Sequence, residues 1–166
     1  GEWAVWLVPA LFSSAIASAF LVTVTVTYML IPEANKRGDN ITHYFNWDSQ
    51  LMHNGNVIFI LIEMAVSDIS LSLWYVPYPV IFGCIYVLFS AFNARRSGIY
   101  FYDFIDPRLN GSHIIHMVLL GVMSIHFILI LIVQGLAELN FTGYVLTLVV
   151  ISYLATTFSD PSEKGD

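Results

Sequence analysis

The sequence predicts an all-helical integral membrane bundle of about five transmembrane segments, with an aromatic segment at the membrane interface. Of the 166 residues, 57% are hydrophobic and only 11% are charged, and the mean hydropathy is +0.73. A soluble domain has about a quarter of its residues charged, so this composition is typical of a membrane protein. Apolar runs of roughly 20 residues, enough to cross about 30 Å of hydrocarbon, recur along the chain. We therefore expect residues 1–166 to form a single transmembrane domain.

The predicted helices cover about residues 4–31, 49–67, 79–93, 112–138 and 143–157. The first is the clearest apolar run, with Pro9 within its first two turns and Pro32 marking its end. Asp48 or Ser49 is the expected N-cap of the second helix, which is near the lower limit of spanning length.

Between the third and fourth predicted helices lies SGIYFYDFIDPRLNGS, residues 97–112. It is too aromatic for an ordinary loop, and it is interrupted too often by Gly, Asp and Pro to form a span. We expect it to lie along the interface or to enter the membrane as a short re-entrant segment. A plain connector whose tyrosines anchor it at the interface is an equal alternative.

The basic residues all follow the first, third or fifth predicted helix: Lys36, Arg37, Arg95, Arg96, Arg108 and Lys164. The positive-inside rule then places the C-terminus inside and Gly1 outside. We expect a multi-pass protein of an endomembrane or an organellar inner membrane. The net charge is −6, and without a basic face no nucleic-acid partner is expected. Cys84 is the single cysteine, which excludes an internal disulfide.

The second predicted helix carries a stripe of polar residues. Projected at about 100° per residue, these residues share one face with His53: Ser49, Asn56, Glu63 and Ser67. Asn54 points elsewhere. Ionisable groups are costly in hydrocarbon, so we expect this stripe to line a site or a water-filled cavity. The alternative is interhelical hydrogen bonding without a site.

The fourth predicted helix repeats this pattern around His116. His113, Gln134 and Glu138 share its face, whereas His126 points away. This face is expected to pair with the second helix across a shared cavity, with His116 among the lining residues. For His113 and Glu138, side chains that reach toward water from the helix ends are an equally good explanation.

Two stretches resemble a known family. LMHNGNVIFILIEM, residues 51–64, resembles the histidine-bearing helix of the androgen-induced transmembrane hydrolases, which cleave fatty acid esters of hydroxy fatty acids. SGIYFYDFIDP, residues 97–107, is similar to that family's Gly-aromatic-x-Tyr-Pro segment, although Asp103 stands in place of the proline. The resemblance covers about residues 3–135.

The resemblance implies a threonine nucleophile and a histidine base within the membrane, and the histidine of the pattern falls on His53. The family's threonine lies on a helix upstream of this chain, so we expect its counterpart to be absent. A neutral imidazole at His53 can take a proton from an attacking hydroxyl, and Asn56 can orient the ring or donate to the oxyanion. Thr23 and Thr27 are expected to bond within their own helix, which makes them poor nucleophiles.

The sequence is therefore compatible with two functions. The first is a lipid-ester hydrolase, active or degenerate, with His53 as catalytic base and with Ser49, Asn56, Glu63 and His116 lining the substrate site. The second is a non-catalytic transmembrane subunit of a larger complex that binds membrane lipids and partner helices. A b-type cytochrome is disfavoured, because His113 and His126 point about 140° apart on a straight helix. No cofactor or metal is expected.

Overall fold

The structure is a computed structural model that describes residues 2–100, 102, 106 and 108–158. Every regular element within these ranges is helical. The chain divides into two compact units. Unit 1 comprises Gly1–Ser18 and Leu71–Leu129, and unit 2 comprises Ala19–Ser70 and Ile130–Asp166.

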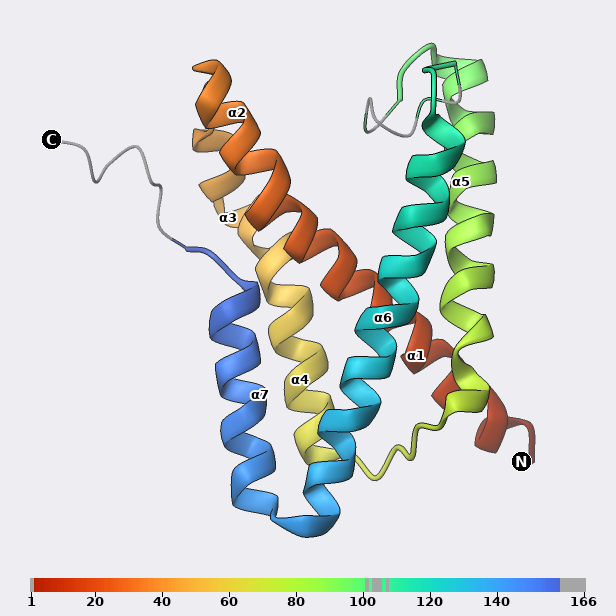
Figure 1. Ribbon diagram of the computed structural model, residues 1–166, viewed down its shortest axis with the longest axis vertical. Helices are drawn as coiled ribbons and strands as arrows, with labels where there is room; N and C mark the ends of the chain where they lie inside the picture. The colour runs from red at the N-terminus through yellow and green to blue at the C-terminus, as the bar shows by residue number, and fades with distance from the viewer. Residues whose placement is uncertain (1, 101, 103–105, 107, 159–166) are drawn as a thin grey trace, which may run out of the picture. The chain divides into compact units, whose positions relative to one another are not determined.

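The first long helix continues past the end predicted from the sequence. It consists of α1 (Glu2–Thr25), the π-helical turn η1 (Val26–Leu30) and α2 (Ile31–Arg37), which follow one another without a break (Figure 1). The predicted end at Pro32 is wrong, because this proline falls in the first turn of α2 directly after the wider π-helical turn. The helix ends instead at Gly38, whose φ of 74° is left-handed.

The second predicted helix also has a π-helical turn within it. It consists of α3 (Trp47–Gln50), η3 (Leu51–Gly55) and α4 (Asn56–Val66), preceded by the 3₁₀ turn η2 (Thr42–Phe45). Its N-cap is the extended residue Asn46, so the N-cap predicted at Asp48 or Ser49 is wrong. Asp48 lies in the first turn, where its negative charge interacts favourably with the positive N-terminal end of the helix dipole.

Unit 1 contains the 3₁₀ turn η4 (Leu73–Tyr75), α5 (Pro77–Ser97) and most of α6 (Ser112–Leu139). Helix α5 starts two residues before and ends four residues after the predicted range of 79–93. Gly83 lets α5 and α6 approach closely, because a Cβ added there would lie 2.5 Å from a side-chain carbon of Leu120.

In unit 2 the chain turns at Asn140 into α7 (Phe141–Ala155). The Asn140 side chain accepts a hydrogen bond from the Gly143 N–H at 3.2 Å, so it is the N-cap of this helix. At 15 residues, α7 is about 22 Å long, shorter than the roughly 30 Å of hydrocarbon in a bilayer.

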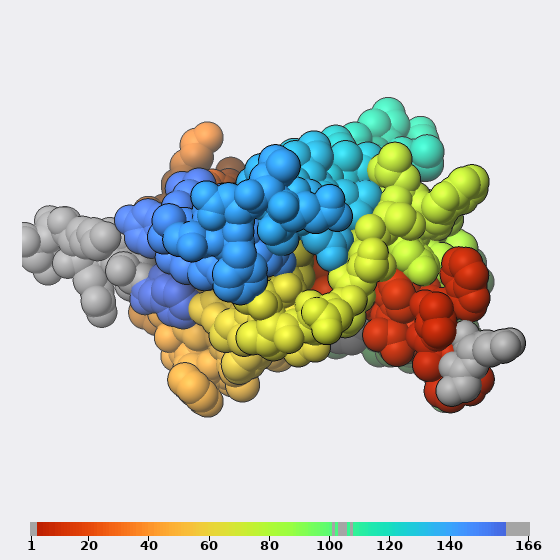
Figure 2. Space-filling view, turned by 90° about the horizontal axis from the view of Figure 1, so that it is seen from below, coloured from red at the N-terminus to blue at the C-terminus, as the bar shows by residue number. Residues whose placement is uncertain are grey.

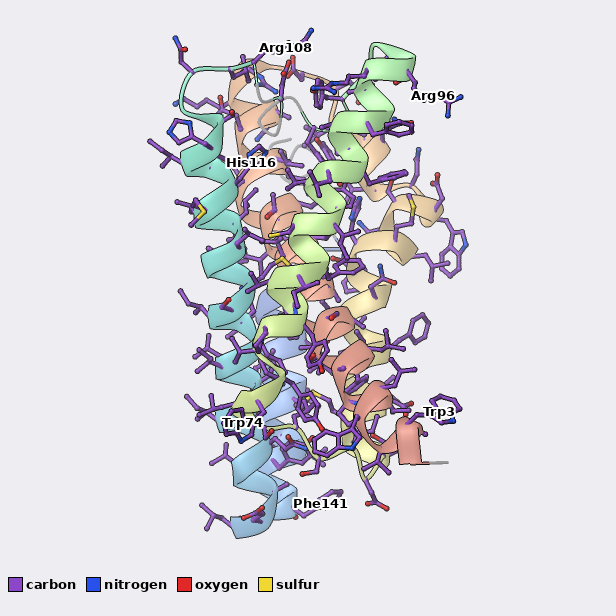
Figure 3. All side chains as sticks on the ribbon, turned by 90° about the vertical axis from the view of Figure 1, so that its right-hand side faces the viewer. Trp3, Trp74, Arg96, Arg108, His116 and Phe141 are labelled. Carbon is purple, nitrogen blue, oxygen red and sulfur yellow. The ribbon has the colours of Figure 1, made fainter. Side chains whose placement is uncertain are left out.

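Three helices are long and apolar enough to cross a membrane: Trp3–Arg37, Leu73–Ser97 and Ser112–Leu139. The protein is therefore a helical membrane protein. In unit 1, Trp3 and Trp74 lie toward one end of the helices and Arg96 and Arg108 toward the other (Figure 3). Indole rings favour the interface, and basic residues mark the inner side.

The aromatic segment predicted to lie at the interface falls partly outside the described residues. Within the described part, Arg108 forms an ion pair with Asp106, with 2.7 Å between its Nη2 and the carboxylate Oδ2. Its guanidinium also lies over the Tyr100 ring, 5.5 Å from the ring centroid. The hydrogen bonds from Arg108 hold the pKa of Asp106 below its ordinary value.

Candidate functional site

The polar stripe predicted on the second helix is not turned into the interior of unit 2. Asn56 and Glu63 are exposed, and Ser49 and His53 are half-buried. Asn54, which the projection placed away from the stripe, is the buried one, at 2% exposed. His116 lies on α6 in unit 1 and is half-buried.

The π-helical turn η3 explains why the projection fails. A π-helical turn bonds each residue to the fifth along the chain and so holds one residue more than an α-helical turn. Positions before and after Leu51–Gly55 are therefore no longer related by about 100° per residue. Because of this shift, the face defined from His53 does not continue to Asn56 and Glu63.

Asn54 joins three segments of unit 2. Its Nδ2 donates to the side-chain oxygen of Gln50 at 2.6 Å and to the main-chain carbonyl of Thr157 at 2.5 Å. Gln50 in turn donates to the carbonyl of Tyr44 at 2.9 Å. The buried amide therefore ties the start of the second helix to the end of α7.

The two threonines of the first helix bond across to other helices. Thr23 is fully buried and donates its hydroxyl to the main-chain carbonyl of His53. Thr27 donates to the carbonyl of Ala155 at 3.2 Å. The expectation that both bond back within their own helix is therefore wrong. The Nδ1 of His53 is buried and has no hydrogen-bond partner among the described residues.

Side chains from elsewhere in unit 2 cap the C-terminal end of α7 by donating to its last carbonyls. The last carbonyls of a helix have no partner within it, and leaving them unpaired away from water is costly. Tyr28 donates to Leu154 and Thr27 to Ala155, and Asn54 donates to Thr157 just beyond the helix. All three donors lie in the π-helical turns η1 and η3.

Side chains also cap the C-terminal end of α4, which lies beside the start of α7. The Tyr144 hydroxyl donates at 2.9 Å to the carbonyl of Met64, near the end of α4. Gln134 donates at 2.7 Å to the carbonyl of Ile69 in the following segment. Figure 2 shows the corner between α6 and α7, in blue, packed beside the end of α4, in yellow. Hydrogen bonds therefore join the second helix to α7 near Met64 and to Thr157, just after α7, near Asn54.

A groove of about 1050 Å³ opens between these helices of unit 2. Its lining comes from the η1–α2 stretch, from α4, and from α7 with the residues just after it. The lining near the α6–α7 corner is apolar: Leu61, Ala65, Val145 and Leu148. The lining at the opposite end carries amide and hydroxyl groups: Asn35, Thr156 and Thr157. We call this cavity the α4–α7 groove.

The residues predicted to line a site do not line the α4–α7 groove. Ser49, His53, Asn56 and Glu63 are absent from the described side chains around it. Sequence reasoning missed the groove because Val, Leu, Ser and Thr are ordinary residues in a membrane helix. The one available signal was the length of α7, which is too short to reach both membrane surfaces.

Comparisons of the chain with family models, with curated proteins and with solved structures find no match. The described residues also bring together no group of three or more His, Cys, Asp or Glu side chains that could hold a metal ion.

Proposed function

We propose that this chain is a multi-pass membrane protein that binds a membrane lipid in the α4–α7 groove and acts as a non-catalytic subunit. The observation that carries the proposal is the groove itself. Ligand sites typically have volumes of about 300–1,000 Å³, with mostly apolar walls and a few polar groups that fix orientation. The α4–α7 groove, at about 1050 Å³, has the size and the lining for one acyl chain.

The chemistry of the lining also favours a lipid. Acyl chains in the bilayer are as apolar as the walls of the groove, so moving a chain into it gains little hydrophobic free energy. Retention of the lipid therefore depends on packing against Leu148 and Leu61 and on hydrogen bonds at the polar end. These hydrogen bonds would distinguish a bound lipid from bulk lipid.

We further propose that five helical segments lie in the membrane, with the C-terminal side of α7 facing inside. Basic residues that follow alternate segments support this topology, among them Lys36, Arg95 and Arg108. Helix α7, at 15 residues, would cross only part of the hydrocarbon. Exposed apolar side chains such as Leu88, Phe92 and Met117 would face lipid or partner transmembrane subunits.

Obstruction of the groove tests the proposal. Val149 lines the groove and is 61% exposed, whereas Val150, its neighbour on the same helix, is 54% exposed and lies outside the described lining. We expect Val149→Trp to reduce photo-crosslinking to a lipid with a diazirine in its acyl chain, and Val150→Trp to leave it unchanged. Equal crosslinking of both variants, both folded by size-exclusion chromatography, would contradict lipid binding in the groove.

Lipid-ester hydrolysis is the second candidate, supported by the free ring nitrogen of His53. A buried imidazole nitrogen without a partner can accept a proton from water or from a hydroxyl. Thr23 is a poor nucleophile for such a reaction, because its hydroxyl is fully buried and bonded to a main-chain carbonyl.

One assay distinguishes lipid binding without catalysis from lipid-ester hydrolysis. Purified protein is incubated with a fatty acid ester of a hydroxy fatty acid, and release of free fatty acid is measured. Turnover that is lost in His53→Ala and kept in His43→Ala, where the histidine is exposed, would favour the hydrolase. Absence of turnover in the wild-type protein would favour the non-catalytic function.

A further inference from the structure

We infer that the α4–α7 groove selects a lipid with an uncharged headgroup, such as a diacylglycerol, and holds that headgroup at its Asn35–Thr157 end. This inference rests on the proposed function. It adds the class of lipid and the direction in which the lipid is bound.

The direction follows from the polarity of the groove. Along α7 and the residues just after it, the lining changes from the apolar Val145 to the polar Thr156 and Thr157. Asn35 lies in α2, directly before its charged last turn. Lys36 and Arg37 form the last turn of α2, which marks this end as the level of the lipid headgroups. A diacylglycerol bound along the groove would therefore place its polar part near Asn35 and one of its two chains toward Leu61.

The polar groups at this end differ in whether they can bind a ligand. Thr27, Tyr28 and Thr156 already donate to main-chain carbonyls. The side chains of Asn35, Ser152 and Thr157 have no hydrogen-bond partner among the described residues, although all three line the groove. An amide and two hydroxyls are suited to the hydroxyl and ester oxygens of an acylglycerol.

The charge of the lining points to the same class of lipid. The described side chains around the α4–α7 groove include no Asp, Glu, Lys or Arg. An ionised headgroup drawn into the groove would lose hydration without gaining an opposite charge. Arg37 is held by Asp39 at 2.9 Å, and Lys36 lies outside this lining. The walls therefore favour a neutral headgroup over a phosphate.

The test compares two lipids with identical acyl chains, diacylglycerol and phosphatidic acid, as photo-crosslinking probes on the full chain in nanodiscs. We expect the wild-type protein to prefer diacylglycerol by about tenfold, the ratio that a difference of about 1.4 kcal/mol produces. Asn35→Lys supplies a cation at the polar end and should shift the preference toward phosphatidic acid. Asn46→Lys, which adds the same charge at an exposed position outside the lining, should not.

Each outcome has a distinct meaning. Equal labelling by both lipids, with both signals still lost in Val149→Trp, would overturn the headgroup inference and leave lipid binding intact. Labelling that is insensitive to Val149→Trp would overturn the proposed function itself. A preference for phosphatidic acid in the wild-type protein would assign the groove to anionic lipids. Asn35→Gln keeps the amide, so it should retain the preference for diacylglycerol. That result would show that the changed preference of Asn35→Lys comes from the added charge and not from loss of the fold.

Discussion

The side-chain amide of Asn54 donates a 2.5 Å hydrogen bond to the main-chain carbonyl of Thr157, which lies 103 positions further along the chain. One buried side chain thereby closes the end of α7 and fixes it against the second helix. Asn56, two positions along from Asn54, is exposed, and its one bond to a described residue goes to the carbonyl of Met52 in its own helix. The two asparagines provide a matched pair for measuring the bond between helices.

Asn54→Leu is expected to destabilise the protein by about 1–2 kcal/mol, because the carbonyl of Thr157 and the side-chain oxygen of Gln50 lose a donor in an apolar environment. Asn56→Leu should change stability by less than about 0.5 kcal/mol, as exposed positions usually do. Unfolding in mixed micelles, followed by circular dichroism, measures both. Equal losses in the two variants would mean that the bond to Thr157 contributes nothing measurable.

Tyr144→Phe tests the other end of the α4–α7 pair. The Tyr144 side chain is 3% exposed and donates to the carbonyl of Met64, so removing its hydroxyl should cost about 1 kcal/mol. Tyr153→Phe is the control, since Tyr153 lies on the same helix and is 81% exposed. The same unfolding measurement applies. A loss in Tyr153→Phe as large as that in Tyr144→Phe would contradict the role of the buried hydroxyl.

Gly83→Ile tests the close packing of α5 and α6 in unit 1. A methyl group at this position would require only the end of the Leu120 side chain to rotate away, but a branched side chain would also press on Met123. We expect overpacking to cost about 1–3 kcal/mol. Gly121→Ile is the control, because nothing lies within 4 Å of a Cβ added there. Similar melting temperatures for the two variants would argue against a tight α5–α6 contact.

We expect the ion pair between Asp106 and Arg108 to break at low pH, when the Asp106 carboxylate is protonated. Its hydrogen bonds lower the pKa of Asp106 from the ordinary 3.8. The stabilisation that the ion pair gives the folded state is therefore fully present above pH 3.8. It is lost as the pH falls through the lower pKa that Asp106 has in the folded state. Carboxyl NMR chemical shifts of Asp106 should show a midpoint below 3.8, and Arg108→Gln should return it toward that value. A midpoint at or above 3.8 in the wild-type protein would contradict the ion pair.

The positions of the helices could be predicted from the sequence, because long apolar runs in a membrane protein leave few alternatives to helix. Residues 112–138 were expected to be helical, and α6 covers Ser112–Leu139. Where helices begin or end was harder to predict. Pro32 was expected to end the first helix, but the preceding π-helical turn lets the helix continue to Arg37.

The groove could not be predicted, because part of its lining comes from a π-helical turn, Val26–Leu30, that has no clear signal in the sequence. A projection at constant pitch assigned His53, Asn56 and Glu63 to one inward face. The turn at Leu51–Gly55 instead buries Asn54. Contacts such as Tyr28 with Leu154 join residues far apart in the chain, and no local pattern indicates them.

The way α7 is closed at its C-terminal end has a consequence for biogenesis. Thr27, Tyr28 and Asn54 are synthesised before Leu154, Ala155 and Thr157, so the donors are already present when these carbonyls emerge. Helix α7 therefore has its hydrogen-bond donors available as soon as it is synthesised. A variant that lacks these donors should release α7 with exposed carbonyls, and it should be recognised by membrane quality control before any loss of stability appears in the mature protein.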